Sequence, residues 1–370
     1  MKVSCLQENL SRALELVNHV IDTRGIWPQC VLMATDGDRL KMIATNLEMT
    51  ITCWIGAKIE EEGSIAVKAK LLSDFVSSLP AERIDLSVSK TRKLGLSVKC
   101  SRQEADISGM SIKDFLPIPN IKDGVTVKVE AEALRNAIAK IAFVAATDLS
   151  RPVLTGVSAK FEGNLLTFAA TDSFRLAVYK LPTSEPVSQN MDIIIPARTL
   201  SELNRLGITQ DDPIEITVNA SKSQVCFRLK NTELVSQLIQ GSYPNYTPLI
   251  PQKYSTRAVT NVSDLLRAVK IASSFSRDTG GIVRLEIIAS KVIVSTRSED
   301  TGDSIAELDA SMEGQDTKIA FNGKYLAEVL STLNNQQISI EMNGSSNPAV
   351  FRSVGDDNYI HAIMPIFVQW

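Results

Sequence analysis

Residues 165–181 read LLTFAATDSFRLAVYKL, with two apolar and β-branched runs on either side of a short polar turn. This pattern predicts a β-hairpin. The same plan returns in residues 40–51, LKMIATNLEMTI, and in a weaker form in residues 292–305. Thr45, Thr171 and Thr296 hold the same place in these copies, and they lie 126 and 125 residues apart in a chain of 370. A period of this length predicts one domain repeated three times rather than a solenoid.

Each predicted copy contains two helices, one at its start and a shorter one later. Apolar residues recur every three or four positions along the first helices, and Asn261 is placed to cap the one in the third copy. The helices do not alternate one-for-one with strands, so the sequence predicts an α+β fold with two helices packed on antiparallel sheet in each domain. The predicted helices span residues 6–21, 70–79, 131–145, 197–206, 262–275 and 323–333.

Linker-like segments separate the copies. Gly, Pro and polar residues gather near 121–126 and 250–258, which is typical of domain boundaries. The predicted domains are therefore residues 1–122, 126–250 and 256–370.

The composition restricts the class of protein. The chain is 44% hydrophobic and 22% charged with a net charge of −3, which is typical of a globular protein that is not basic as a whole. It has neither an apolar signal segment at its start nor an apolar run long enough to span a membrane, so we expect a cytoplasmic location. Five widely spaced cysteines and two histidines argue against a disulfide framework and a zinc site. We expect no metal and no cofactor.

Motifs for catalysis are missing from the sequence. It has no Gly-x-Gly-x-x-Gly, no Walker motif and no Gly-x-Ser-x-Gly. The acidic segment 299–303 lacks the ligand alternation of a calcium loop and is interpreted as a solvated turn. Three copies of one domain without a distinctive cluster of polar residues favour a scaffold or binding protein over an enzyme. Two alternatives stay open: a stand-alone enzyme with a cleft between domains, such as a hydrolase, and a monomeric peptide-binding adaptor.

Basic residues repeat at the domain spacing. One set lies after the first helices, and the other lies at the start of the second helices. If the copies form a ring, these side chains would point at a common axis. The two sets are Arg24, Arg151 and Arg277, spaced 127 and 126 residues apart, and Lys70, Arg198 and Lys324, spaced 128 and 126 residues apart.

Five segments resemble one known family, the bacterial DNA polymerase III beta subunits, or sliding clamps. Residues 170–176, ATDSFRL, are similar to the family's Ala-Thr-Asp-x-x-Arg-Leu signature. Residues 45–49, 243–246, 321–322 and 364–365 match further family motifs in the same order, so the resemblance covers the whole chain.

The resemblance implies an architecture and a function. It implies three clamp-type domains per subunit and a head-to-tail homodimer that closes into a ring with twelve helices inside. Twelve helices, each about 10 Å across, leave a hole of about 28 Å, which admits duplex DNA. The implied function is that of a non-catalytic processivity factor. The implied partners are double-stranded DNA bound without sequence specificity, the replicative DNA polymerase, the clamp loader and other proteins with a clamp-binding motif, with no membrane.

The resemblance also implies roles for individual residues. The six repeated basic residues would contact DNA, and Ala105, Ile107 and Phe275 would lie at the dimer interface. The implied peptide-binding groove consists of Leu154, Thr171, Ser173, Phe174, Arg175, Leu176, Pro244, Pro248, Leu249, Ala362, Met364, Pro365 and Ile366.

Two departures from the family pattern affect the expected groove. Pro248 stands where many relatives have a basic residue, and the tail Phe367–Trp370 is longer than usual, so we expect Trp370 to fold over the groove. The alternative interpretation is that Phe174, Met364 and Phe275 are core residues and that the repeated basic residues serve only solubility.

Overall fold

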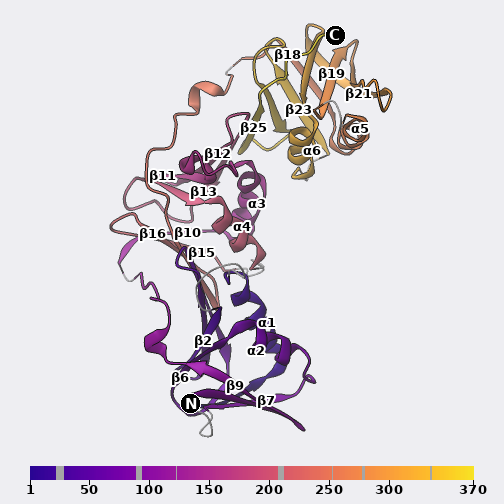
Figure 1. The fold of residues 1–370 in the computed structure, drawn as a ribbon. Helices are drawn as coiled ribbons and strands as arrows, with labels where there is room; N and C mark the ends of the chain where they lie inside the picture. The colour runs from indigo at the N-terminus through magenta and orange to yellow at the C-terminus, as the bar shows by residue number, and fades with distance from the viewer. Residues whose placement is uncertain are drawn as a thin grey trace. The chain divides into compact units, whose positions relative to one another are not determined.

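The chain forms two compact units, each built on one continuous antiparallel sheet (Figure 1). The computed structural model describes residues 1–21, 29–88, 94–121, 123–206, 212–251, 253–276, 280–333 and 336–370. Unit 1 comprises Met1–Glu132, Ser184–Ser188 and Glu202–Leu238. Unit 2 comprises Ala133–Thr183, Gln189–Ser201 and Ile239–Trp370. Because the units divide the second predicted copy between them, the three-domain boundaries stay a prediction.

The sheet of unit 1 holds thirteen strands among the described residues, in the order β10-β15-β16-β17-β4-β3-β2-β6-β9-β8-β7-β1-β5. Strands that follow one another pair in three groups, β2–β3–β4, β7–β8–β9 and β15–β16–β17. Strand β9 pairs with β8 along its first part and with β6 at its end. The strands are β1 (Lys2–Leu6), β2 (Cys30–Asp36), β3 (Arg39–Thr45), β4 (Met49–Gly56), β5 (Lys58–Glu61), β6 (Ser64–Lys68), β7 (Arg83–Val88), β8 (Gly95–Cys100), β9 (Gln103–Met110), β10 (Gly124–Val129), β15 (Ile214–Asn219), β16 (Gln224–Arg228) and β17 (Thr232–Gln237).

The sheet of unit 2 holds twelve strands in the described ranges, in the order β14-β11-β12-β13-β25-β24-β23-β18-β21-β20-β19-β22. The strands are β11 (Gly156–Glu162), β12 (Leu165–Thr171), β13 (Arg175–Pro182), β14 (Met191–Pro196), β18 (Thr256–Asn261), β19 (Ile282–Ile288), β20 (Lys291–Thr296), β21 (Ser304–Gly314), β22 (Thr317–Asn322), β23 (Gln337–Met342), β24 (Ala349–Ser353) and β25 (Tyr359–Ile363).

All six predicted helices are present, within a few residues of their expected ends. Helices α1 and α2 lie side by side in unit 1, and α5 and α6 do so in unit 2 (Figure 1). The predicted cap is confirmed, because the Asn261 side chain accepts hydrogen bonds from the amides of Ser263 and Asp264 at the start of α5. The helices are α1 (Gln7–Asn18), α2 (Ala69–Ser77), α3 (Ala131–Ile141), α4 (Ala197–Arg205), α5 (Val262–Phe275) and α6 (Gly323–Ser331).

The α+β class and the three hairpins are confirmed. The hairpin predicted at 165–181 is β12 and β13, and its counterparts are β3 with β4 and β20 with β21. Alternation places Leu166 and Phe168 in the core, and the neighbouring Ala169 lies in a second cluster on the other face of the sheet. Because both faces of this sheet are covered, its strands are apolar along most of their length.

The repeats join one another by strand pairing. In unit 1, the last strand of the second repeat, β17, pairs with β4 of the first repeat. In unit 2, the last strand of the third repeat, β25, pairs with β13 of the second repeat in the equivalent register. Each unit therefore contains one joint of the same design.

The tail after β25 runs along the edge strand β22. The Ile366 amide donates to the Ala320 carbonyl, and the Lys318 ammonium lies 5.5 Å from the centre of the Trp370 ring. The expectation that Trp370 folds over the groove is therefore wrong, since its ring packs against β22. No helix in the described ranges is long and apolar enough to cross a membrane.

Candidate functional site

The turn between β12 and β13 is held in one conformation by its own polar side chains. Asp172 Oδ1 accepts the amides of Phe174 and Arg175 at 2.9 and 3.0 Å. Thr171 Oγ1 accepts the Ser173 amide and donates to the Arg175 carbonyl. Ser173 has a φ of 80°, which these bonds compensate. The Thr-Asp signature is therefore the chemistry of a rigid turn.

Arg175 lies in the interior of unit 2 and is only 7% exposed. Its Nε donates to Asp172 Oδ2 at 3.0 Å, one terminal nitrogen donates to Glu328, and the other donates to the Phe143 carbonyl at 3.0 Å. The guanidinium also stacks on the rings of Phe143 and Tyr325. Three of its five N–H donors are used inside the protein, so Arg175 positions the turn, and its place in the peptide-binding groove stays a prediction.

Phe174 points away from the core although it follows a buried strand. It is 60% exposed, and its carbonyl accepts the Met364 amide at 2.8 Å. Met364 is itself 42% exposed, and Leu249 is 52% exposed. Met364 is joined to the rigid turn by this backbone bond, and Leu249 precedes Ile250, which packs against the cluster that contains Leu176. Exposed apolar side chains beside a rigid turn indicate a binding surface. We call Phe174, Leu249 and Met364 the apolar rim.

Buried residues support the apolar rim. Leu176 and Ala362 face each other across the joint and belong to one cluster with Tyr246 and Ile250 packed against it. Tyr243 binds the Thr171 amide through its hydroxyl at 3.1 Å. Of the predicted groove residues, Leu154, Thr171, Arg175, Leu176 and Ala362 are buried, Pro365 and Ile366 are half-buried, and Ser173, Phe174, Pro244, Pro248, Leu249 and Met364 are exposed.

The repeated basic residues occupy equivalent places. Lys70, Arg198 and Lys324 are each the second residue of their helix, α2, α4 and α6, and all three are exposed. Arg151 is exposed too, but it donates to Ser173 Oγ at 2.7 Å and so lies beside the turn that carries Phe174. Arg24 and Arg277 lie outside the described residues.

The predicted dimer residues differ in exposure. Ala105 and Phe275 are half-buried, and Ile107 is 4% exposed in unit 1, so its side chain belongs to the core. Gln103–Ile107 of β9 pair with β8, and the described strands provide no second partner for that segment.

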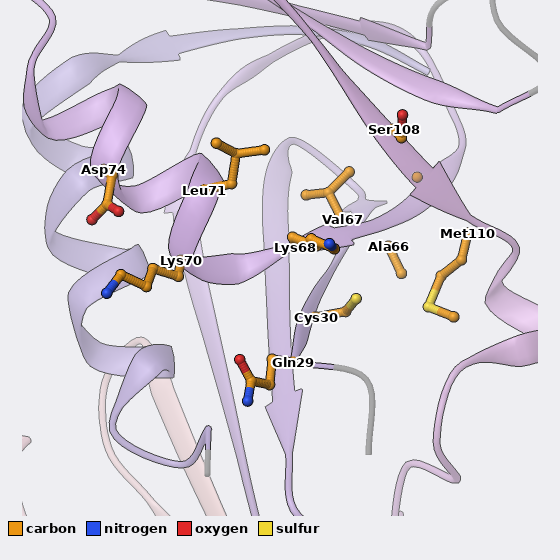
Figure 2. Close-up of a pocket in the computed structure, with 11 residues that line it drawn as sticks. Gln29, Cys30, Ala66, Val67, Lys68, Lys70, Leu71, Asp74, Ser108 and Met110 are labelled. Carbon is orange, nitrogen blue, oxygen red and sulfur yellow. The ribbon is translucent and has the colours of Figure 1, made fainter. Parts of the chain in front are cut away.

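A cavity of about 730 Å³ lies beside the end of β9 (Figure 2). Lys68, Lys70 and Asp74 provide its charged groups, and Cys30 and Met110 provide sulfur and carbon surface. The small residues Ala66 and Gly109 also line it. Burial raises the pKa of the Cys30 thiol, so this cysteine is not an activated nucleophile. Within the described ranges, no cluster of His, Cys, Asp and Glu is placed to hold a metal.

Sequence reasoning missed two residues. Ile305 is 71% exposed on β21, on the face that it shares with Glu307 and Asp309, and an apolar residue among charged ones was the available signal. Glu328 shares its place in the second helix with Asp74 and Glu202, 254 and 126 residues earlier, so a repeat of acidic residues was also readable.

Comparison with known proteins identifies the family. Three family models match the chain in succession: the N-terminal, central and C-terminal domains of the DNA polymerase III beta subunit, at residues 1–120, 128–245 and 247–367. A beta sliding clamp from Staphylococcus aureus is 31% identical over 327 residues, which cover 87% of this chain and 85% of that protein. One from Staphylococcus epidermidis is 32% identical over the same coverage.

The chain belongs to the family of DNA polymerase III beta subunits, the beta sliding clamps. As a sliding clamp it is a processivity factor of DNA polymerase and a non-catalytic subunit, which decides against the stand-alone hydrolase. The solved sliding clamp of Bacillus subtilis matches the whole chain with a TM-score of 0.94 at 25% identity. The beta chain from Streptococcus pneumoniae covers 99% of this chain with a TM-score of 0.91 at 26% identity.

Proposed function

We propose that the apolar rim is the site where this clamp binds short hydrophobic segments of the replicative polymerase, the clamp loader and other clamp-binding proteins. The observation that carries the proposal is the exposure of Phe174 on a turn that its own side chains make rigid. Each Leu or Phe side chain that a peptide buries there contributes roughly 1.5–3 kcal/mol, and a preformed turn adds no ordering cost.

Met364→Ala tests the groove. Met364 and Gln237 occupy the same position in the two joints, because each donates its amide to the turn that faces it, at 2.8 Å. Met364→Ala should weaken binding of a short peptide with Leu and Phe side chains, measured by calorimetry, whereas Gln237→Ala should leave that affinity unchanged. Equal affinity for both variants would remove the groove from this location.

We further propose that Lys70, Arg198, Lys324, Arg151, Arg24 and Arg277 contact duplex DNA. The equivalent placement of the first three on α2, α4 and α6 supports a shared role. Lysine and arginine contacts to phosphate carry no sequence information and allow sliding along the duplex. The expected cellular location is the cytoplasm, where DNA and polymerase are found.

The dimer should close by a third joint of the same design. The two joints within the chain pair β17 with β4 and β25 with β13. The remaining last strand is β9, and the remaining hairpin strand is β21. We propose that β9 of one copy pairs with β21 of a second copy, which covers edges that would otherwise invite aggregation and closes a head-to-tail ring.

Ile305 carries this dimer proposal. Its equivalents by hairpin register are Thr52 on β4 and Val178 on β13, which lie opposite Glu233 and Ile360 in their joints, and both are buried. Transferring that register to the third joint puts Ile305 of the second copy opposite Glu104, and Ser304 opposite Ala105. The dimer would therefore cover Ile305, as the joints within the chain cover Thr52 and Val178.

The charges beside this joint are complementary. Transferring the register brings the acidic turn 299–303 of the second copy toward the cavity that holds Lys68 and Lys70 (Figure 2). The Thr301 hydroxyl donates to the Phe275 carbonyl at 2.6 Å, so the turn is tied to the end of α5. This tie gives Phe275 its role at the joint, together with the backbone of Ala105 and Ile107.

Ile305→Glu tests the joint without touching either core. The variant should sediment as a monomer at micromolar concentration, because Ile305 is exposed in one copy and a carboxylate there would face Glu104 in the dimer. Val354→Glu, at an exposed apolar position outside the joint, is the matched control and should remain dimeric. A persistent Ile305→Glu dimer would contradict this register. Retention of wild-type protein on nicked circular DNA, with release when the circle is cut, separates a closed ring from the monomeric adaptor.

A further inference from the structure

The turn that carries Phe174 depends on a residue from a distant part of the chain. Glu328, on α6, contacts the Arg175 guanidinium across 153 residues of sequence. Arg175 in turn binds Asp172 Oδ2, and Asp172 Oδ1 accepts the two amides that shape the turn. Glu328 therefore reaches the apolar rim through two side chains without lying in it.

The buried charge in this chain of contacts is shared. One guanidinium, 6% exposed at its side chain, is balanced by Asp172 and Glu328. Asp172 has two tasks, since one oxygen balances Arg175 and the other caps the turn. A buried cation that loses one anionic partner depends more on the other. Without the charge of Glu328, Asp172 would shift toward Arg175, and its bonds to the amides of Phe174 and Arg175 would weaken.

The other ion pair of Glu328 does not compete with this role. Lys324 Nζ lies 3.9 Å from Glu328 Oε1, and the Lys324 side chain is mostly exposed. Exposed pairs at this spacing on a helix contribute little. The contact with buried Arg175 is therefore the one that gives Glu328 an effect elsewhere in unit 2.

We propose that Glu328 is a positioning residue of the peptide groove, acting through Arg175 and Asp172 to hold Phe174 ready for a hydrophobic side chain. This inference rests on the proposed function of the apolar rim. Helix α6, whose first turn carries Lys324 with its proposed DNA contact, would then have a second role in protein binding. Glu328 would act there without touching the peptide.

Glu328→Gln is the direct test, because it keeps the shape and a hydrogen-bond acceptor but removes the charge. The full-length variant should bind a labelled short peptide with Leu and Phe side chains about tenfold more weakly, mainly through faster dissociation. Glu202→Gln is the matched control. Glu202 has the equivalent place on α4 but pairs with His19 and Arg205 in unit 1, so peptide affinity should not change.

A double-mutant cycle separates positioning from general stability. If Glu328 acts through Phe174, the double variant with Phe174→Ala should bind as weakly as Phe174→Ala alone. Additive losses, or wild-type affinity for Glu328→Gln, would overturn the proposal. Failure of the groove itself gives a different result, since Phe174→Ala and Met364→Ala would then both bind the peptide like wild type.

Discussion

The turns 45–50 in unit 1 and 171–176 in unit 2 have the same backbone conformation but carry different side chains. In both, the threonine hydroxyl binds two backbone groups, an Asn or Asp side chain accepts two amides, and the third residue has a positive φ, 73° at Leu47 and 80° at Ser173. The next residues are Glu48 and Met49 in unit 1 but Phe174 and Arg175 in unit 2. Unit 1 buries Met49, whereas unit 2 buries a cation and exposes a phenyl ring.

Two residues distinguish the turns, and we expect this change to adapt the repeated turn of unit 2 to binding. Burying Arg175 requires Asp172, Glu328 and the Phe143 carbonyl as partners, and these partners fix the exit direction of the chain at Phe174. A buried methionine needs no such set. The joint in unit 1 therefore holds two repeats together. We expect the joint in unit 2 to hold two repeats together and also to bind peptides.

Exchanging the buried residue should have the largest effect. Arg175→Met gives unit 2 the residue of unit 1 and leaves two carboxylates without their cation. We expect the free energy of unfolding of the transition that includes unit 2 to fall by about 3–5 kcal/mol, measured by denaturant titration. Met49→Leu, a swap of similar volume, should cost less than about 1.5 kcal/mol. A similar small cost for Arg175→Met would mean that the buried ion pairs behave like surface pairs.

Removing the exposed residue should affect binding and spare the fold. Phe174→Ala should weaken binding of a short Leu- and Phe-containing peptide by about 1.5–3 kcal/mol, because one apolar contact is lost from the rim. Calorimetry measures this change directly. Glu48→Ala makes the same change in the turn of unit 1 and should leave peptide affinity unaltered. Equal losses for the two variants would show that the two joints do not differ in recognition.

The joints should also differ in their response to pH. Burial, with Arg175 nearby, lowers the pKa of His361 from 6.5 to about 3. Between these values the unfolded chain binds a proton that the folded chain does not, so stability falls as the pH drops below 6.5. From pH 7 to pH 5 this one group should remove about 2 kcal/mol.

His361→Leu checks the pH prediction, because Leu234 has the equivalent position in the joint of unit 1. Thermal unfolding at pH 7 and pH 5 should show a smaller difference for the variant than for wild type. An unchanged difference would assign the pH dependence to other groups. The variant also loses the bond between the Tyr359 hydroxyl and His361 Nδ1 at 2.9 Å, but that loss is the same at both pH values and does not contribute to their difference.

The smallest expected effects come from the basic residue that all three repeats carry at the start of their second helix. Lys70→Gln, Arg198→Gln and Lys324→Gln should each reduce the slope of log affinity for duplex DNA against log salt by about 0.9. Lys291→Gln, on a strand of unit 2, is the control and should leave the slope as it is. A change confined to one of the three helices would limit DNA contact to that repeat.

Much of the fold could be predicted from the sequence because the same short-range patterns recur in each repeat. The helices, the three hairpins and the Asn261 cap depend on periodicity and on capping residues that lie within a few positions of their targets. The basic residues on α2, α4 and α6 were readable for the same reason. The burial of Arg175 was not, because its partners Phe143 and Glu328 lie 32 and 153 residues away in the chain.

The repeat, the α+β class, the helix positions and the turn signature could be predicted from the sequence, since each arises from contacts between residues close in the chain. Four features became visible only in the folded chain: Arg175 is buried, Phe174 and Met364 are exposed beside it, Ile107 is core, and Trp370 packs on β22. The physical reason is that exposure and ion pairing depend on which distant segment covers a side chain. Pairing between strands of different repeats determines which side chains are covered, and the periodicity of the sequence does not show this pairing.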